Sequence, residues 1–249
     1  MTINERLYDL CREKAAAVTV ETLSLGLGYT AVQTSDGGLG LAYTYLERKI
    51  GCSVRKNDFD FEGQPADLLL EKIKQPNPLE KSLALALVNA LNHAAARDLP
   101  EDPKNEVLYD HFQISRGTRV SMVGYFGPLI KALENRGAIL EIIDEHRSLG
   151  SPDSFKAQLA DRTDVLILTS TSLLNDSADG ILEQLGPGAR AVVLGPSTPM
   201  IAAAFEGLPV QMLAGAVPVK ANAIFKGVRF GMGTPVLLRS CLKKYLILP

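Results

Sequence analysis

Three apolar stretches in the second half of the chain each end in glycine, serine or threonine. Their final residues are Gly124, Tyr125, Phe126 and Gly127; Thr169, Ser170 and Thr171; and Gly195, Pro196, Ser197 and Thr198. Small hydroxylated residues beside the free amides of a helix N-terminus suit an anionic or polar ligand. We therefore take these three groups as the candidate ligand-binding residues.

The segment that would position the first group spans residues 118–146. Val120–Val123 has the length of a strand, and Pro128 stands where a helix should begin, because its missing N–H is not needed there. Gly137 is placed to end that helix. A second apolar run follows at residues 138–143, so the pattern predicts strand, glycine turn, helix and strand, the opening of a doubly wound sheet.

The rest of the second half continues the alternation of strands and helices. We expect further strands at 165–169, 190–200 and 208–218, and helices at 151–162, 181–188, 202–206 and 234–247. The closing helix would be capped by Thr234 and would bury Cys241 as a small hydrophobe. Continuous apolar strands alternating with helices predict a parallel sheet covered on both faces.

In such a sheet a ligand binds beyond the carboxyl ends of the strands, where the strand order reverses. The usual order makes the first and fourth strands neighbours at that point. Residues 124–127 and 195–198 should then meet, with 169–171 nearby.

The type of ligand stays open at this stage. Asp144 follows Gly124 by 20 residues, where an acid could hold the ribose of a dinucleotide. However, the loop has G-x-x-G rather than G-x-G-x-x-G, and Tyr125 and Phe126 would crowd a pyrophosphate. The two rings look more like a wall for a small planar or apolar group, and S-adenosylmethionine is a further alternative.

The first half shows a different pattern, that of an α+β unit. A helix capped by Thr2 or Asn4 should run to about residue 17, followed by three antiparallel strands. Asp36-Gly37 predicts a type I′ hairpin turn. After an irregular segment at 51–63, which is either a surface loop or the lining of a cleft, two helices should cover 65–74 and 78–98. Asn89 and Asn92 lie in the apolar second helix and must find partners.

Several of these residues together resemble a known family. The run DVLILTSTSLLNDSADGILEQL, then VVLGPSTPM and LAGAVPV, is similar to a prokaryotic family labelled as heavy-metal chelation proteins. Thr169-Ser170-Thr171, Asn175 and Gly195-Pro196-Ser197 occupy its motif positions. Ser170 replaces the usual glycine, and Asp176-Ser177 replaces Gly-Thr. In the first half, GYTAV, GLGLAYTY and LALALVNALN resemble the family's N-terminal domain, which is similar to that of enolase.

The resemblance implies two domains, an enolase N-terminal-like α+β domain at 1–110 and a Rossmann-like α/β domain at 111–249. It also implies an interdomain site, to which it adds Asn175, and a role in metal chelation or the handling of a chelator. The hypotheses are therefore a small-molecule binding protein or enzyme, a direct metal-binding protein, or a non-catalytic scaffold.

Short motifs do not assign the chemistry. The three histidines and three cysteines are far apart, with no C-x-x-C or H-x-x-x-H, so we assign no metal ligands. A hard-cation site would have to be assembled from Glu47, Asp58, Asp60 or Asp176. Ser170 and Ser197 lack a G-x-S-x-G elbow and an identifiable histidine partner, and the acid–base candidates Glu47, Asp144 and Lys220 are not distinguished. The catalytic residues and the cofactor stay unassigned.

Composition bounds the remaining alternatives. The chain has 249 residues, 46% of them hydrophobic, and a net charge of −2. Scattered Lys and Arg give no reason to expect a nucleic-acid or membrane partner, and no apolar run approaches the ~20 residues of a membrane span. The three widely spaced cysteines and the absence of a signal-peptide pattern favour a reducing cytoplasm. A twofold homodimer is the expected assembly.

Overall fold

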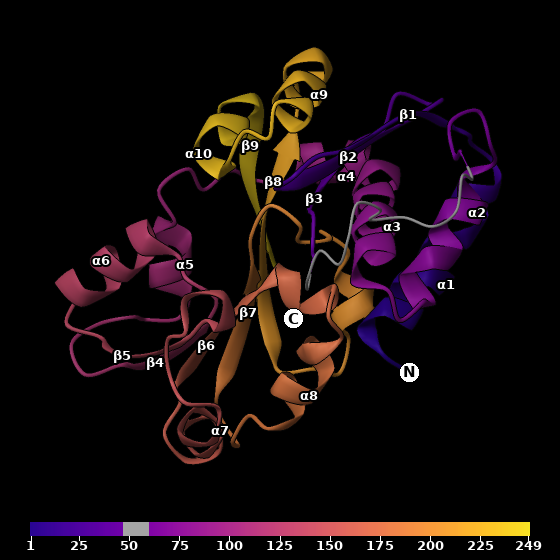
Figure 1. Cartoon of the computed structure of the whole chain (residues 1–249). Coiled ribbons are helices and arrows are strands. Elements are labelled where there is room, and N and C mark those ends of the chain that lie inside the picture. The colour runs from indigo at the N-terminus through magenta and orange to yellow at the C-terminus, as the bar shows by residue number, and fades with distance from the viewer. Residues whose placement is uncertain (47–59) are drawn as a thin grey trace.

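The computed structural model describes residues 1–46 and 60–249. Most of the irregular segment predicted at 51–63 therefore lies outside the described residues. The first half folds as a three-stranded sheet with helices, and the second half as a six-stranded sheet with helices (Figure 1). The α/β fold class predicted from the sequence is confirmed.

The first half begins with α1 (Ile3–Ala16). Thr2 forms a capping box with Glu5, so the predicted cap is confirmed. The meander follows with β1 (Val20–Leu25), β2 (Tyr29–Thr34) and β3 (Leu39–Tyr43), paired antiparallel in that order.

The turn between β2 and β3 differs from the predicted type I′. Gly37 has φ +84°, whereas Asp36 does not adopt positive φ. The Asp36 carboxylate accepts from Thr34 Oγ1 at 2.6 Å and from the Gly38 amide at 3.3 Å. These bonds close a longer loop in which a single left-handed residue, the glycine, is sufficient.

Helices α2 (Ala66–Leu70), η1 (Glu71–Lys74), α3 (Pro78–Leu91) and α4 (His93–Asp98) complete the first half. The predicted helix at 78–98 is thus interrupted at Asn92. The amide of Asn92 donates to the Met200 carbonyl at 2.8 Å, and Asn89 donates to the carbonyls of Leu41 and Ser197. Both amides find backbone partners, and they connect the two halves of the chain.

The second half contains two helices at positions where none was predicted, α5 (Glu106–His111) and α9 (Ala221–Arg229). Its other elements are β4 (Arg119–Val123), α6 (Gly127–Asn135), β5 (Ile139–Ile143), η2 (Glu145–Arg147), α7 (Pro152–Asp161), β6 (Val165–Thr169), η3 (Ser170–Leu173), α8 (Ser177–Glu183), β7 (Arg190–Leu194), η4 (Ala202–Phe205), β8 (Val210–Pro218), α10 (Thr234–Leu237), η5 (Leu238–Ser240) and β9 (Cys241–Ile247). The predicted βαβ opening at 118–146 is confirmed as β4, α6 and β5.

The strand order corrects the predicted neighbours at the switch point. The sheet runs β5-β4-β6-β7-β8-β9, so the first strand of this half, β4, pairs with the third, β6, and not with the fourth. The order reverses between β4 and β6 because α6 leads to one side of β4 and α7 leads back across it.

The predicted closing helix at 234–247 is wrong over most of its length. After one short helix, Cys241–Ile247 forms β9, which pairs antiparallel with β8 from Met212↔Ile247 to Pro218↔Cys241. The apolar spacing at 236–242 fits a helical face, but β8 would otherwise leave a long unpaired edge, and pairing satisfies its backbone groups. Cys241 is half-buried on this strand rather than in a helix core.

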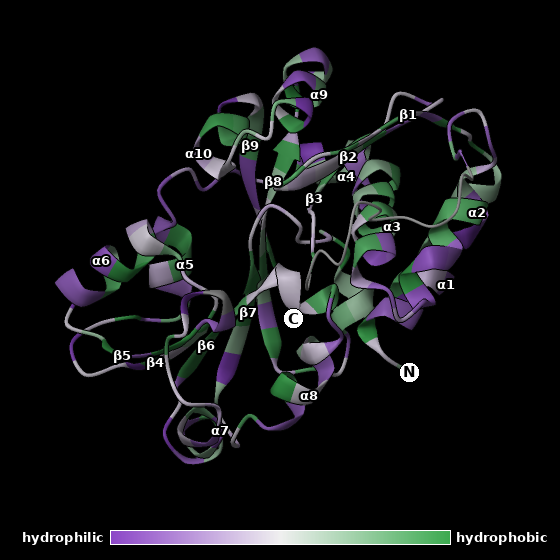
Figure 2. Ribbon diagram, viewed as in Figure 1, coloured by the Kyte–Doolittle hydropathy of each residue, from purple (hydrophilic) through white to green (hydrophobic). Residues whose placement is uncertain are grey.

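Two hydrophobic clusters cover the faces of the six-stranded sheet. One face packs against α5 and α6, and the other packs against α7, α8 and η4. The second cluster continues without a break into α1 and α3, so both halves share it. Figure 1 shows the first half against one side of the sheet and α5 and α6 on the opposite side. Hydrophobic residues line α3 and the strands between these layers (Figure 2).

In the described part of the chain, no helix has the length and apolar character needed to cross a bilayer.

Candidate functional site

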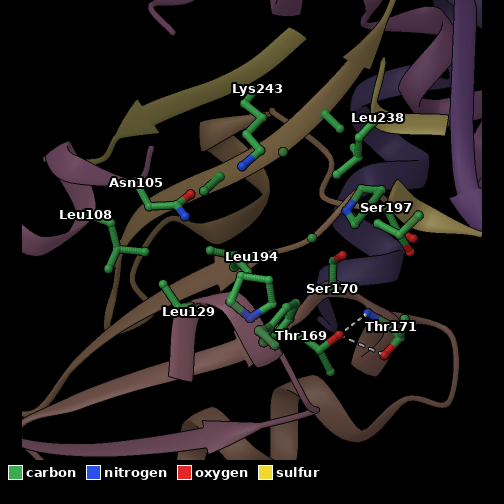
Figure 3. A pocket seen from close by; sticks show the side chains of 18 of the residues that line it. Asn105, Leu108, Leu129, Thr169, Ser170, Thr171, Leu194, Ser197, Leu238 and Lys243 are labelled. Atoms are coloured by element: carbon green, nitrogen blue, oxygen red, sulfur yellow. Dashed lines mark hydrogen bonds between the residues drawn. The ribbon is translucent and has the colours of Figure 1, made fainter. Parts of the chain in front are cut away.

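A cavity of about 490 Å³ lies at the carboxyl ends of β6 and β7, beside β8 and β9. The face of the sheet at β8 and β9 forms its floor, and the N-terminal end of α6 forms one wall. Tyr29 and Tyr43 reach it from the first half of the chain. This first cavity is therefore lined from both halves, largely by apolar groups with a few polar atoms (Figure 3).

Ser170 is the polar side chain that stands out in this cavity. It is only 1% exposed, and its Oγ has no hydrogen-bond partner among the described residues. Gly195 passes close to it, since a Cβ on Gly195 would lie 2.8 Å from Ser170 Oγ. Gly195 also has φ +137°, a conformation that favours glycine. An unsatisfied buried hydroxyl is unfavourable unless a ligand or water completes it.

The hydroxyls next to Ser170 already have protein partners. Ser197 Oγ accepts from the Tyr43 amide at 2.7 Å and so ties β3 to the loop after β7. Thr169 Oγ1 and Thr171 Oγ1 are 3.0 Å apart (Figure 3). The Tyr29 hydroxyl lies 2.6 Å from Thr234 Oγ1. These groups shape the cavity more than they offer free hydrogen bonds.

A second cavity of about 340 Å³ lies on the other side of Thr169 and Thr171, between α7 and α8. Gly124, Asp144 and Asn175 line it. Gly124 has φ +91°, and a Cβ there would lie 3.0 Å from the Thr169 side chain, which is how closely β4 and β6 approach at the switch point.

The polar groups of the second cavity serve local structure. Asn175 Nδ2 donates to the Tyr45 hydroxyl at 3.2 Å, and its Oδ1 accepts from Ser177 Oγ at 2.7 Å. Asp144 caps η2 by accepting from the Arg147 amide at 3.0 Å. Next to Asn175, Asp176 forms an ion pair with the buried Lys81. Through Tyr45 and Lys81, these interactions join the two halves of the chain.

The structure thus divides the predicted site residues. Nine of the thirteen line the first cavity, and Gly124, Asp144 and Asn175 line the second, with Thr169 and Thr171 shared between them. Thr198 lines neither; it is buried beneath the loop, 3% exposed, with no partner for its Oγ1 among the described residues.

Several residues that line the first cavity were not predicted from the sequence, because they come from distant elements. Tyr29 and Tyr43 come from the meander, Asn105 from the loop before α5, and Lys243 and Tyr245 from β9. Asn105 has φ +60°, unusual for a residue other than glycine. The alternation of Lys243 and Tyr245 was a strand signal, but the helical spacing just before it concealed the change of period.

The metal-ligand candidates are occupied, buried or outside the described residues. Burial raises the pKa of the Cys11 thiol to about 11 and that of Cys241 to about 12, so both stay protonated near neutral pH. His93 Nε2 is 2.8 Å from the Pro218 carbonyl, and burial lowers its pKa. Among the described residues, no three His, Cys, Asp or Glu side chains gather as a metal-binding set.

The hard-cation and acid–base candidates are equally dispersed. Asp60 accepts from the Glu62 amide, Asp176 is paired with Lys81, and Lys220 lines neither cavity. Glu47 and Asp58 lie outside the described residues. His93 and His111 also line neither cavity, so no histidine is placed to activate Ser170 or Ser197 within the part whose side chains are described.

Comparison with known proteins assigns the family. Two models with the description "Putative heavy-metal chelation", DUF4213 and DUF364, match residues 8–92 and 107–247. The chain belongs to this family. The family resemblance seen in the sequence motifs is therefore confirmed.

Relatives support the fold over the whole chain. An uncharacterized protein from Methanocaldococcus jannaschii is 23% identical over 98% of this chain and 95% of its own length. Crystal structures of DUF364 proteins of unknown function from Pyrococcus horikoshii and Desulfitobacterium hafniense align with TM-scores of 0.80 and 0.77. Their identities are 18% over 99% of this chain and all of theirs, and 20% over 98% of both. At these identities the structures establish the fold alone.

Proposed function

We propose that this protein binds a small organic molecule of the chelator class in the first cavity, between its two halves. A metal reaches that site already held by the organic molecule. The observation that carries the proposal is Ser170, a buried hydroxyl without a partner among the described residues in a largely apolar cavity of about 490 Å³. Ligand pockets typically combine apolar walls of this volume with a few placed polar groups.

The chemistry of the side chains supports an organic ligand over a bare ion. Soft metals need thiolates or neutral imidazoles, whereas Cys11 and Cys241 hold their protons and His93 is engaged with a carbonyl. Tyr125 and Phe126 contribute flat apolar surface to the lining of the cavity. Such surface contacts a planar organic body well and offers nothing to a hydrated ion.

The test is native mass spectrometry of the purified protein, followed by calorimetric titration with 2-naphthoate and with Ni²⁺. The control is Ala214→Phe, because Ala214 lies on the floor of the first cavity and a phenyl ring there would occupy part of it and block a planar ligand. We expect an organic mass or 2-naphthoate to bind the wild type and not the filled variant. Ni²⁺ bound equally by both proteins, with no organic binding, would support direct metal binding instead. Binding of neither would support the scaffold hypothesis.

A further inference from the structure

We propose that the molecule bound in the first cavity is an organic anion, with its carboxylate at the Lys243 end and its apolar body over β7 and β8. This inference rests on the proposed function and specifies the class of ligand. It comes from the placement of one lysine and from the charges around it.

Lys243 lies on β9 and lines the cavity. Its Nζ donates to the Pro103 carbonyl at 3.0 Å, and it forms no ion pair with any carboxylate in the described parts of the chain. Figure 3 shows the ammonium group and the Asn105 side chain at the same end of the cavity. A cation held by one neutral acceptor retains donors for a ligand anion.

The neighbouring Lys244, in contrast, has its ammonium group engaged by protein partners. Lys244 is 6% exposed, and its Nζ donates to the Leu99 carbonyl at 2.8 Å and pairs with Glu101 at 3.2 Å. Lys244 also lines the cavity, but its ammonium group is already held by the Leu99 carbonyl and the Glu101 carboxylate. The two adjacent lysines therefore have separate roles.

The carboxylate of Asp102, which also lines the cavity, already accepts hydrogen bonds from backbone donors. Asp102 accepts from the amides of Glu106, Val107 and Leu108 at 2.8, 3.0 and 3.4 Å, where it caps α5. A carboxylate bonded to three amides at a helix N-terminus is poorly available to a lysine. Lys243 is thus left for an external anion.

The segment of the chain around Lys243 is positively charged, as Lys243 itself is. Residues 207–249, which form β8, α9, α10 and β9, contain six Lys or Arg and no Asp or Glu, although the whole chain carries −2. Three of these elements adjoin the cavity. A one-sided concentration of positive charge attracts anions to a cleft. Elsewhere in the cavity lining, Ser170 has a hydroxyl without a partner among the described residues.

The experiment compares two probes that differ in charge and little else, 2-naphthoate and 2-naphthamide, by calorimetric titration of the full chain. The wild type should bind the carboxylate about tenfold more tightly, because a charge-assisted hydrogen bond outweighs a neutral one by that order. Lys243→Met should lose this preference, because the side chain keeps most of its length and loses its charge.

Lys226→Met is the matched control. Lys226 is exposed on α9, belongs to the same acid-free segment and lines neither cavity. It removes the same unit of charge, and the preference should stay within about twofold of wild type because solvent and salt screen a distant exposed charge.

The outcomes separate the two proposals. Equal affinity of the wild type for both probes, or an unchanged preference in Lys243→Met, would overturn the anion inference and leave the proposed function standing. Binding of neither probe, together with no organic mass retained by the purified protein, would overturn the proposed function itself. An unfolding curve for Lys243→Met that matches wild type would show that lost binding is not lost folding.

Discussion

The two cavities lie on either side of Thr169 and Thr171, and they use polar side chains in opposite ways. Around the second cavity, Asn175, Asp144 and Asp176 all have protein partners. In the first, Ser170 has none and Lys243 has one carbonyl. Both regions contain residues that match the family motif or the strand-end pattern. Motif membership therefore does not distinguish residues whose hydrogen bonds are satisfied from a residue such as Ser170, whose hydroxyl has no partner among the described residues.

The largest expected effect is the loss of stability when the ion pair between Asp176 and Lys81, next to the second cavity, is broken. Asp176→Ala would leave the buried ammonium group of Lys81 without its carboxylate partner. The side chain of Lys81 is 3% exposed and that of Asp176 is 59% exposed. We expect a loss of about 3 kcal/mol in the free energy of unfolding, the lower end for breaking a buried pair, since water can partly reach the site. Lys81→Met removes the buried charge and should cost less. Urea denaturation measures both, and a smaller loss for Asp176→Ala than for Lys81→Met would contradict this account.

The next effect concerns the close approach in the first region. Gly195→Ala places a Cβ 2.8 Å from Ser170 Oγ and puts alanine at φ +137°. The strain should cost about 2 kcal/mol. The double variant Gly195→Ala/Ser170→Ala removes the contact but not the φ strain, so it should recover part of the loss. Additive effects in this double-mutant cycle would show that the contact does not matter.

A smaller pair of effects compares the two regions directly. Ser170→Ala removes an unsatisfied hydroxyl, so stability should stay equal or rise by about 1 kcal/mol, while 2-naphthoate binding weakens. Asn175→Ala removes satisfied hydrogen bonds, so stability should fall by about 1 kcal/mol with binding unchanged. Thermal unfolding and calorimetry measure the two quantities. The comparison fails if Asn175→Ala abolishes binding in a folded protein.

The smallest effect is a pH dependence outside both cavities. Burial lowers the pKa of His93 below its ordinary 6.5. The unfolded chain then binds the proton more readily than the folded one, so stability is complete above about pH 6.5 and falls as pH drops toward the lowered pKa. His93→Gln should remove this decline, which should be below about 1 kcal/mol for a partly exposed group. Unfolding curves at pH 7.5 and 5.5 measure it; equal slopes in both proteins would exclude His93 as the cause.

The local elements follow closely from the sequence. Thr2 and Glu5 specify the start of α1, Pro128 and Gly137 bracket α6, and the continuous apolar runs at 120–123 and 165–169 form parallel strands. Caps, turn residues and periodicity act over a few neighbouring residues, so these features can be recognised along the chain. The glycine, serine and threonine residues at the strand ends could be predicted for the same reason.

Other features depended on partners far away in the chain. β9 forms because the edge of β8 needs hydrogen bonds, although its first residues fit a helical pattern. The neighbour of β4 depends on the path of whole crossovers. Tyr29, Tyr43 and Lys243 reach the first cavity from three separate strands.

The sequence by itself determined the family, the α/β class and the glycine, serine and threonine residues at the strand ends, because each is encoded in short, contiguous patterns. The tertiary structure alone decided which of those residues have their hydrogen-bonding groups satisfied by other parts of the protein. Asn175 is satisfied by Tyr45 and Ser177, whereas Ser170 is enclosed without a partner. Whether a buried polar group is satisfied depends on every element packed around it, and no local pattern contains that information.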